Sequence, residues 1–293
     1  MLTLSYKNFR NLLRIFPICP KPEAIGLENI PQNEPTLFVF NHVTRRAEPL
    51  FLQLAAPARL DIRFFAEITL VSTYKLARTK RDIMNSIFPP HRQKKMGQNS
   101  LKGFFFEKFA DLLTRFFIAQ MRRFHIIPVY LHDPPTREEE LKKWRVNKDA
   151  LRECLKSLES NVPVAIAPSG GSTHETAGIP IFQTIVPTLA SLLYKKGKVV
   201  KIVPCIIKER PELSQKTYKK YVADRIPPCR FLRWLMNRIK GESYERPRLT
   251  VEFLAPLTFA KANPLKLEKV LFVAELQKIM YTSLKKDNEG RER

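Results

Sequence analysis

Short apolar runs and longer amphipathic segments alternate along this chain. The short runs are rich in β-branched and aromatic residues, which is typical of buried strands; they cover 37–40, 61–67, 126–131, 162–167, 199–207 and 249–254. The longer segments repeat apolar residues at helical spacing; they cover 101–123, 149–158, 185–193 and 265–284. Alternation of this kind predicts an α/β fold with a mostly parallel central sheet flanked by helices.

The N-terminal segment differs from the rest of the chain. Apolar residues recur at helical spacing over 2–16, with Lys7, Arg10 and Arg14 on other faces, and Pro17 and Pro20 end the pattern. This pattern predicts a basic amphipathic N-terminal helix within 1–25 and an α/β domain over 26–293. Two interpretations of the helix stay open: it lies on a membrane, or it packs as an ordinary first helix.

Charge narrows the choice of partner. The chain holds 51 Lys and Arg against 28 Asp and Glu, a net charge of +23, which favours a polyanionic partner. Its basic residues are dispersed and no nucleic-acid-binding signature is present, so a nucleic-acid partner is the weaker alternative. The N-terminal helix, the Phe-rich segment 101–123 and the Trp-containing segment 230–240 interleave apolar and basic residues. These segments predict peripheral attachment to an anionic membrane surface on the cytoplasmic side.

Several classes of protein are disfavoured. No apolar run reaches the roughly 18 residues that suggest a spanning helix. The cysteines Cys19, Cys154, Cys205 and Cys229 lack metal-ligand spacing, and we expect reduced, buried or incidental thiols in a cytosolic compartment. We therefore expect no metal and no cofactor.

The strand at 37–40 runs directly into Asn41 and His42. In α/β sheets the carboxyl ends of strands are where ligands bind. His42 could take a proton from a hydroxyl there, while Glu48, six positions later, folds back to orient the ring and stabilise the imidazolium. The alternative is a surface histidine followed by an acid at a helix start, where acids are favoured.

Four blocks, in order over about residues 26–280, resemble the glycerolipid acyltransferase family, whose members acylate glycerol 3-phosphate and lysophosphatidate. The blocks are Gly-Leu-Glu-Asn-Ile-Pro (26–31) with Pro-Thr-Leu-Phe-Val-Phe-Asn-His (35–42), Val-Pro-Val-Ala-Ile-Ala-Pro-Ser-Gly-Gly (162–171), Ile-Pro-Ile-Phe-Gln (179–183) and Ile-Val-Pro (202–204). The family spaces its histidine and aspartate by four residues, whereas Ala47 stands at that position here and Glu48 follows it.

The resemblance implies a glycerolipid-acyltransferase-like fold that transfers a fatty acyl group from acyl-CoA or acyl-carrier protein to a glycerol-phosphate or lysophospholipid hydroxyl. His42 and Glu48 would be catalytic. Substrate would be bound by backbone N–H groups and by hydroxyl and cationic side chains; these residues are Arg45, Arg46, Ser169, Gly170, Gly171, Thr173 and His174. A catalytically lapsed homologue that binds lipid or a partner is the second interpretation. For the glycines alone, a plain chain reversal is the alternative.

Overall fold

The computed structural model describes residues 21–41, 52–53, 55–57, 60–67, 108, 115, 126–130, 136–168, 183–209 and 248–289. Contacts along the chain divide it into two units. One unit comprises Lys21–Phe65, Ile127–Arg210 and Arg248–Arg293, and it contains nearly all of the described residues. The other comprises Met1–Pro20, Ala66–Ile126 and Pro211–Pro247. The predicted helices at 2–16, 101–123 and 230–240 lie outside the described residues, apart from Lys108 and Arg115.

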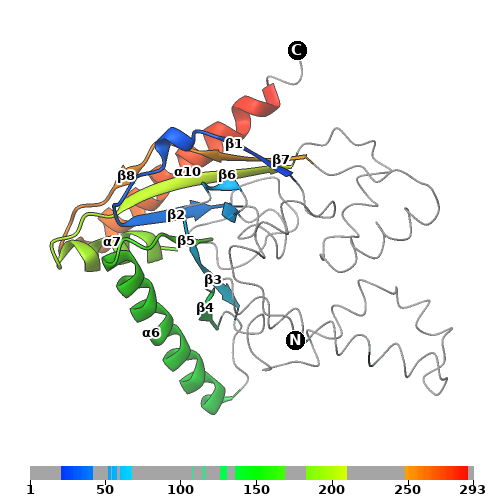
Figure 1. The fold of residues 1–293 in the computed structure, drawn as a ribbon. Helices are drawn as coiled ribbons and strands as arrows, with labels where there is room; N and C mark the ends of the chain where they lie inside the picture. Colours follow the sequence, from blue (N-terminus) through cyan, green and yellow to red (C-terminus); the bar gives the residue numbers. More distant parts are fainter. Residues whose placement is uncertain are drawn as a thin grey trace. The chain divides into compact units, whose positions relative to one another are not determined.

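A sheet of eight strands forms the centre of the described region (Figure 1). Its strands pair in the order β1-β7-β6-β2-β5-β3-β4, and β8 pairs with β6. The strands are β1 (Lys21–Ile25), β2 (Thr36–Phe40), β3 (Arg63–Glu67), β4 (Ile126–Val129), β5 (Val164–Ile166), β6 (Lys201–Glu209), β7 (Arg248–Phe253) and β8 (Leu257–Thr258).

Strand direction makes the sheet mixed but mostly parallel. β2 is parallel to both β5 and β6, β3 is parallel to β5, and β1 is parallel to β7. The antiparallel pairs are β6 with β7 and β6 with β8. The predicted α/β class with a mostly parallel sheet is therefore confirmed, and the antiparallel side of β6 is an addition to it.

Helices α6 (Arg137–Glu159), α7 (Ile185–Tyr194) and α10 (Lys266–Glu289) pack on one face of this sheet. Their buried side chains form one core with alternate residues of β2, β5 and β6, including Leu37, Val164 and Ile202. The other residues of the same strands, such as Phe38 and Val203, belong to a second core that includes Leu52 and Ile62. This assignment of alternate residues to opposite faces follows from the two-residue period of a strand.

α6 is longer than the sequence pattern predicts. The helix predicted over 149–158 begins at Arg137, because the charged residues before position 149 are helical too, so the predicted start is wrong. Thr136 begins the helix, since its hydroxyl oxygen accepts a hydrogen bond from Glu139 N at 3.3 Å. Acidic residues at 138–140 occupy the first turn, where the helix dipole favours negative charge.

β1 occupies the last part of the segment expected to be N-terminal helix. Residues 21–25 pair with β7 as an edge strand, so the sheet begins before the predicted boundary at residue 26. Gly26 then turns the chain with a φ of 74°. A Cβ atom at this position would lie 2.1 Å from Phe253 O, so only glycine fits. Asn29 Nδ2 donates to the same carbonyl oxygen at 2.8 Å and holds the η1 turn (Leu27–Asn29) against β7.

A proline stands inside the central strand β6. Pro204 has no N–H to donate, and its carbonyl oxygen accepts from Leu254 N at 2.9 Å, on the β7 side. At this point β6 changes its antiparallel partner, because Cys205 pairs with Phe253 of β7 and Ile202 with Leu257 of β8. The missing donor thus falls where the ladder is interrupted in any case.

Candidate functional site

Three neighbouring parallel strands end at one edge of the sheet. β2 lies between β5 and β6 and runs in the same direction as both. The carboxyl ends of the three strands therefore meet at the same edge, where α/β folds bind ligands. β2 leads into Asn41, and β5 leads through Ala167 into Pro168.

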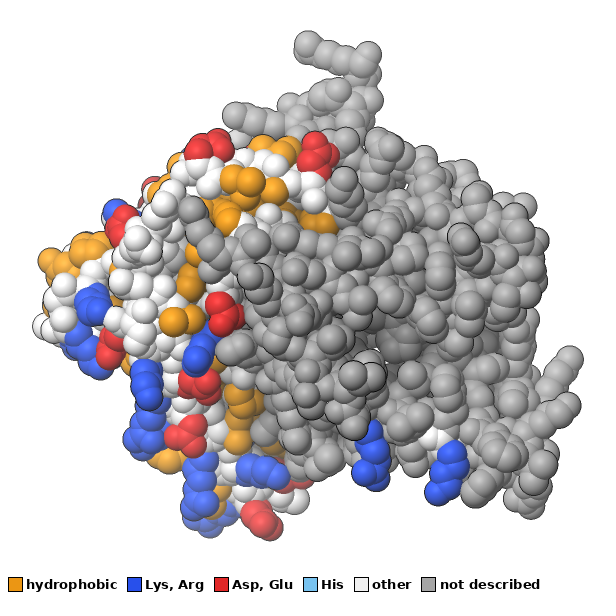
Figure 2. Space-filling view, viewed as in Figure 1, with side chains coloured by type: hydrophobic (Ala, Val, Ile, Leu, Met, Phe, Trp, Pro, Cys, Tyr) orange, Lys and Arg blue, Asp and Glu red, His pale blue; other side chains and the backbone are white. Residues whose placement is uncertain are grey.

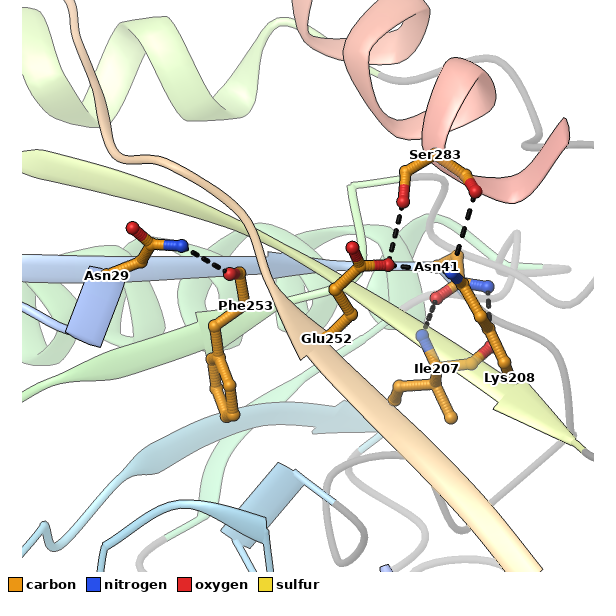
Figure 3. Close-up of polar contacts among 7 residues, drawn as sticks. All are labelled: Asn29, Asn41, Ile207, Lys208, Glu252, Phe253 and Ser283. Atoms are coloured by element: carbon orange, nitrogen blue, oxygen red, sulfur yellow. Dashed lines mark hydrogen bonds and ion pairs between the residues drawn. The ribbon is translucent and has the colours of Figure 1, made fainter. Parts of the chain in front are cut away.

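Asn41 is a buried polar residue, with 4% of its surface exposed, and its amide joins β2 to β6 (Figure 3). Its Oδ1 accepts from Ile207 N at 2.7 Å, and its Nδ2 donates to Ile207 O at 3.1 Å. The last paired residue of β2 is Phe40, opposite Cys205, so the side chain of Asn41 replaces the next backbone pairing. This amide therefore fixes the chain at the end of β2 and gives a partner to both the backbone N–H and the backbone C=O of Ile207.

The next residue of β6 carries an ion pair on the opposite face (Figure 3). Lys208 Nζ lies 2.7 Å from Glu252 Oε2 of β7. The same carboxylate oxygen accepts from Ser283 Oγ of α10 at 2.7 Å, and Lys208 Nζ donates to Ser283 O at 3.5 Å. This cluster ties the later turns of α10 to the sheet.

The predicted site residues all lie outside the described residues; they are His42, Arg45, Arg46, Glu48, Ser169, Gly170, Gly171, Thr173 and His174. Their positions relative to one another, including reach between His42 and Glu48, stay predictions. The described chain stops next to both groups, at Asn41 on one strand and at Pro168 beyond the neighbouring one.

The segment 169–182, which includes the predicted glycine turn, has its two ends joined. Gln183 N donates to Pro168 O at 3.0 Å, so the chain returns to the point where it leaves β5. α7 begins two residues later, at Ile185. The residues between Pro168 and Gln183 therefore start and finish at the carboxyl edge of the sheet.

Two thiols lie in the cores and are unsuited to nucleophilic chemistry. Burial raises the pKa of the Cys205 thiol well above its ordinary range. Burial, together with neighbouring Glu153, raises the pKa of Cys154 to about 12. Both groups stay protonated at neutral pH, and the thiolate is the reactive form. The expectation of buried thiols is confirmed for these two, whereas Cys19 and Cys229 lie outside the described residues.

In the described part of the chain, no group of three His, Cys, Asp or Glu side chains is placed to hold a metal ion. Within the same residues no helix has the length and apolar character needed to cross a membrane.

Sequence reasoning missed the polar contacts that shape this edge. It placed Asn41 only at the end of the strand at 37–40, whereas the Asn41 amide bonds to a residue 166 positions away. It also passed over Lys208 and Glu252. Only Glu252 left a signal, as a charged residue inside the apolar run at 249–254, since Lys208 directly follows the run at 199–207.

Comparison of the sequence with protein-family models and with curated proteins gave no match.

Proposed function

We propose that this protein is an O-acyltransferase of the glycerolipid type, with a glycerolipid-acyltransferase-like α/β fold. It moves a fatty acyl group from acyl-CoA or acyl-carrier protein to a hydroxyl of glycerol 3-phosphate or a lysophospholipid such as lysophosphatidate. No further cofactor takes part. The chain attaches peripherally to an anionic membrane surface on the cytoplasmic side, where its product partitions into the bilayer.

The observation that carries the proposal is the double hydrogen bond between Asn41 and Ile207. It holds the residue before His42 at the carboxyl end of β2, and consecutive Cα atoms are only about 3.8 Å apart. β5, the parallel neighbour, leads at the same edge into the loop closed by Pro168 and Gln183. Both sequence blocks with candidate chemistry therefore leave the sheet at one edge.

In the proposed reaction, the acceptor hydroxyl oxygen attacks the thioester carbonyl carbon while His42 takes the hydroxyl proton. Glu48 orients the imidazole and stabilises its protonated form. Collapse of the tetrahedral intermediate breaks the carbon–sulfur bond, and the leaving thiolate receives the proton from His42. The ester and the free thiol are the products.

The acceptor phosphate would be bound by two groups of residues. Arg45 and Arg46 supply positive charge beside the base. The loop after β5 supplies backbone N–H groups from Gly170 and Gly171, which have no Cβ to obstruct an anion. Hydroxyl and imidazole donors complete the set; they are Ser169, Thr173 and His174.

The decisive measurement is acyl transfer by the purified full chain. It offers glycerol 3-phosphate and lysophosphatidate as acceptors, each with acyl-CoA and with acyl-carrier protein as donor. His42→Ala should lower turnover by about 10²–10⁴-fold, the usual contribution of a general base, with an unchanged circular dichroism spectrum. Glu48→Gln should lower kcat more than it raises the KM for the acceptor, because it removes the charge that supports the imidazolium.

Three results would contradict parts of the proposal. Turnover by His42→Ala equal to that of the unchanged protein would exclude His42 as base. Absence of turnover with every donor and acceptor, alongside lipid binding, would favour the lapsed homologue; tight, salt-sensitive binding to RNA or DNA instead would favour the nucleic-acid interpretation.

A further inference from the structure

The first half of α6 extends away from the core. Its buried residues, Ala150, Cys154, Ser157 and Leu158, all lie in the second half. Two large apolar side chains are instead exposed in the first half: Leu141 is 54% exposed and Trp144 is 60% exposed. Exposed apolar side chains that lie together are a feature of interaction surfaces, and the charge around this pair indicates what kind of partner it suits.

Positive charge surrounds the two apolar side chains. Residues 141–148 read Leu-Lys-Lys-Trp-Arg-Val-Asn-Lys and include no acid. Lys148 Nζ lies 4.4 Å from the centre of the Trp144 ring, a cation–π contact between residues one helical turn apart. We call Leu141, Trp144, Arg145 and Lys148 the α6 ridge. Figure 2 shows Lys and Arg side chains along the surface of α6, with apolar and acidic ones between them.

The acids of α6 lie outside this stretch. Those at 138–140 fill the first turn next to the Thr136 cap. Beyond the ridge, three acids form ion pairs with cations outside it. The oxygen–nitrogen distances are 3.2 Å for Asp149 Oδ1 and Arg152 Nη1, 3.1 Å for Glu153 Oε1 and Arg63 Nη1, and 2.5 Å for Glu159 Oε1 and Lys196 Nζ. The ridge therefore presents cations and apolar groups together, with the acids placed at its ends.

We propose that the α6 ridge docks on an anionic lipid surface. Indole and leucine side chains would enter the boundary between headgroups and acyl chains, and the cations would meet lipid phosphates. Each adsorbed cation contributes about fivefold in affinity at an anionic leaflet. Nucleic acid fits less well, since bases could stack on Trp144 but would gain little from Leu141.

The inference rests on the membrane placement in the proposed function. It deepens that placement, because the ridge is separate in sequence from the three segments predicted to bind lipid. α6 is also held to the sheet by a specific polar contact. Asn147 Oδ1 accepts from Tyr130 N at 2.7 Å, and Asn147 Nδ2 donates to Tyr130 O at 3.1 Å. Docking through the ridge would thereby orient the sheet on the bilayer.

The chain holds two tryptophans, Trp144 and Trp234, which allows a direct test. In Trp234→Phe the emission reports on Trp144 alone. It should shift to the blue on vesicles of equal parts phosphatidylcholine and phosphatidylglycerol, and stay unchanged on phosphatidylcholine alone. No shift on the anionic vesicles would overturn the proposal, as would a shift produced by single-stranded RNA but not by these vesicles.

A matched pair of double variants tests the ridge itself. Leu141→Gln with Trp144→Gln should weaken binding to the anionic vesicles at least about tenfold. The control is Leu267→Gln with Leu271→Gln, which removes two leucines that are 65% and 59% exposed on α10. It should bind as the unchanged protein does. Equal binding by both double variants, or a loss only in the α10 control, would overturn the proposal.

The same variants separate this inference from the proposed function. The ridge variant should keep its turnover with dissolved glycerol 3-phosphate when no vesicles are present, and His42→Ala should keep its vesicle affinity. Vesicle binding through Trp144 by a chain without any acyl transfer would support the ridge and reject the enzyme. Acyl transfer by a chain whose Trp144 emission does not shift on the vesicles would support the enzyme and reject the ridge.

Discussion

Two consecutive residues of β6 join the sheet to its surroundings in opposite ways. Ile207 faces the second core and is held through its backbone by the neutral amide of Asn41. Lys208 faces α10 and is held through its side chain by the carboxylate of Glu252. The Asn41 amide is almost fully buried, whereas in the ion pair the Lys208 side chain is 9% exposed and the Glu252 side chain 24% exposed.

The difference shows how burial decides which chemistry suits a strand end. A buried amide satisfies one donor and one acceptor and brings no charge to be desolvated. A charged pair at the same depth would have to offset the cost of removing two ions from water. The ion pair is partly exposed to water and is hydrogen-bonded by the Ser283 hydroxyl of α10, which reduces that cost. Substitutions at the two contacts should therefore lower the free energy of unfolding by different amounts.

The largest effect is expected for Asn41→Leu, which conserves approximate volume but removes both hydrogen bonds. The N–H and C=O groups of Ile207 would be left buried without partners, at about 1–3 kcal/mol each. We expect the free energy of unfolding to fall by about 2–4 kcal/mol, measured by urea denaturation followed by circular dichroism.

Asn147→Leu is the matched control, because Asn147 makes the same two hydrogen bonds to Tyr130 from a half-buried position. Tyr130 is itself buried. Because Asn147 is only half-buried, water can enter in place of its amide and bond to the Tyr130 backbone groups, so the loss should be only about 1 kcal/mol. A loss at Asn147 as large as that at Asn41 would show that burial does not govern the difference.

A smaller effect is expected for Lys208→Met, which keeps the aliphatic stem and removes the ammonium. The Glu252 carboxylate is partly solvated, so the loss should be about 1–2 kcal/mol rather than the larger cost of a fully buried pair. Adding Glu252→Gln should restore part of the stability. If the double variant lost the sum of the two single losses, the pair would have no coupling.

The last effect concerns Cys154 and is absent at neutral pH. Its pKa is raised from an ordinary 9.0 to about 12. Between these pH values the folded chain keeps the thiol proton while the unfolded chain releases it. Stability from this group is complete below about pH 9 and is lost as the pH rises towards 12. Cys154→Ala should therefore lose less stability than the unchanged protein between those values, in paired denaturation curves. Identical pH profiles would contradict the assignment.

Much of the described fold follows from local sequence. The continuous apolar runs that form β2 and β5 are what strands covered on both faces require, and helical periodicity identifies α7. The general α/β class could be deduced from their alternation. Asn41 and His42 could also be placed after a strand, because the apolar run ends abruptly at Phe40.

The parts that escaped prediction depend on distant partners. β1 reads Lys-Pro-Glu-Ala-Ile, and its strand conformation depends on pairing with β7, more than 200 positions away. The first half of α6 is too polar to resemble a core helix, and its start depends on the Thr136 cap. The antiparallel side of β6 and the bond from Asn41 to Ile207 are topological facts with no local signature.

Pro204 bears on how the sheet opens rather than on how it is built. The amides of β6 alternate between its two neighbours, and the bond from Ile207 N to Asn41 identifies the set that faces β2. On the other side, the change of partner at Pro204 leaves β7 and β8 attached to separate parts of β6. The paired strands β1 and β7 can thus separate from the sheet as one cooperative unit while β2, β6 and β8 stay paired. In native-state hydrogen exchange, the amide of Ile206, which faces β7, would then exchange earlier than the amide of Cys205, which faces β2.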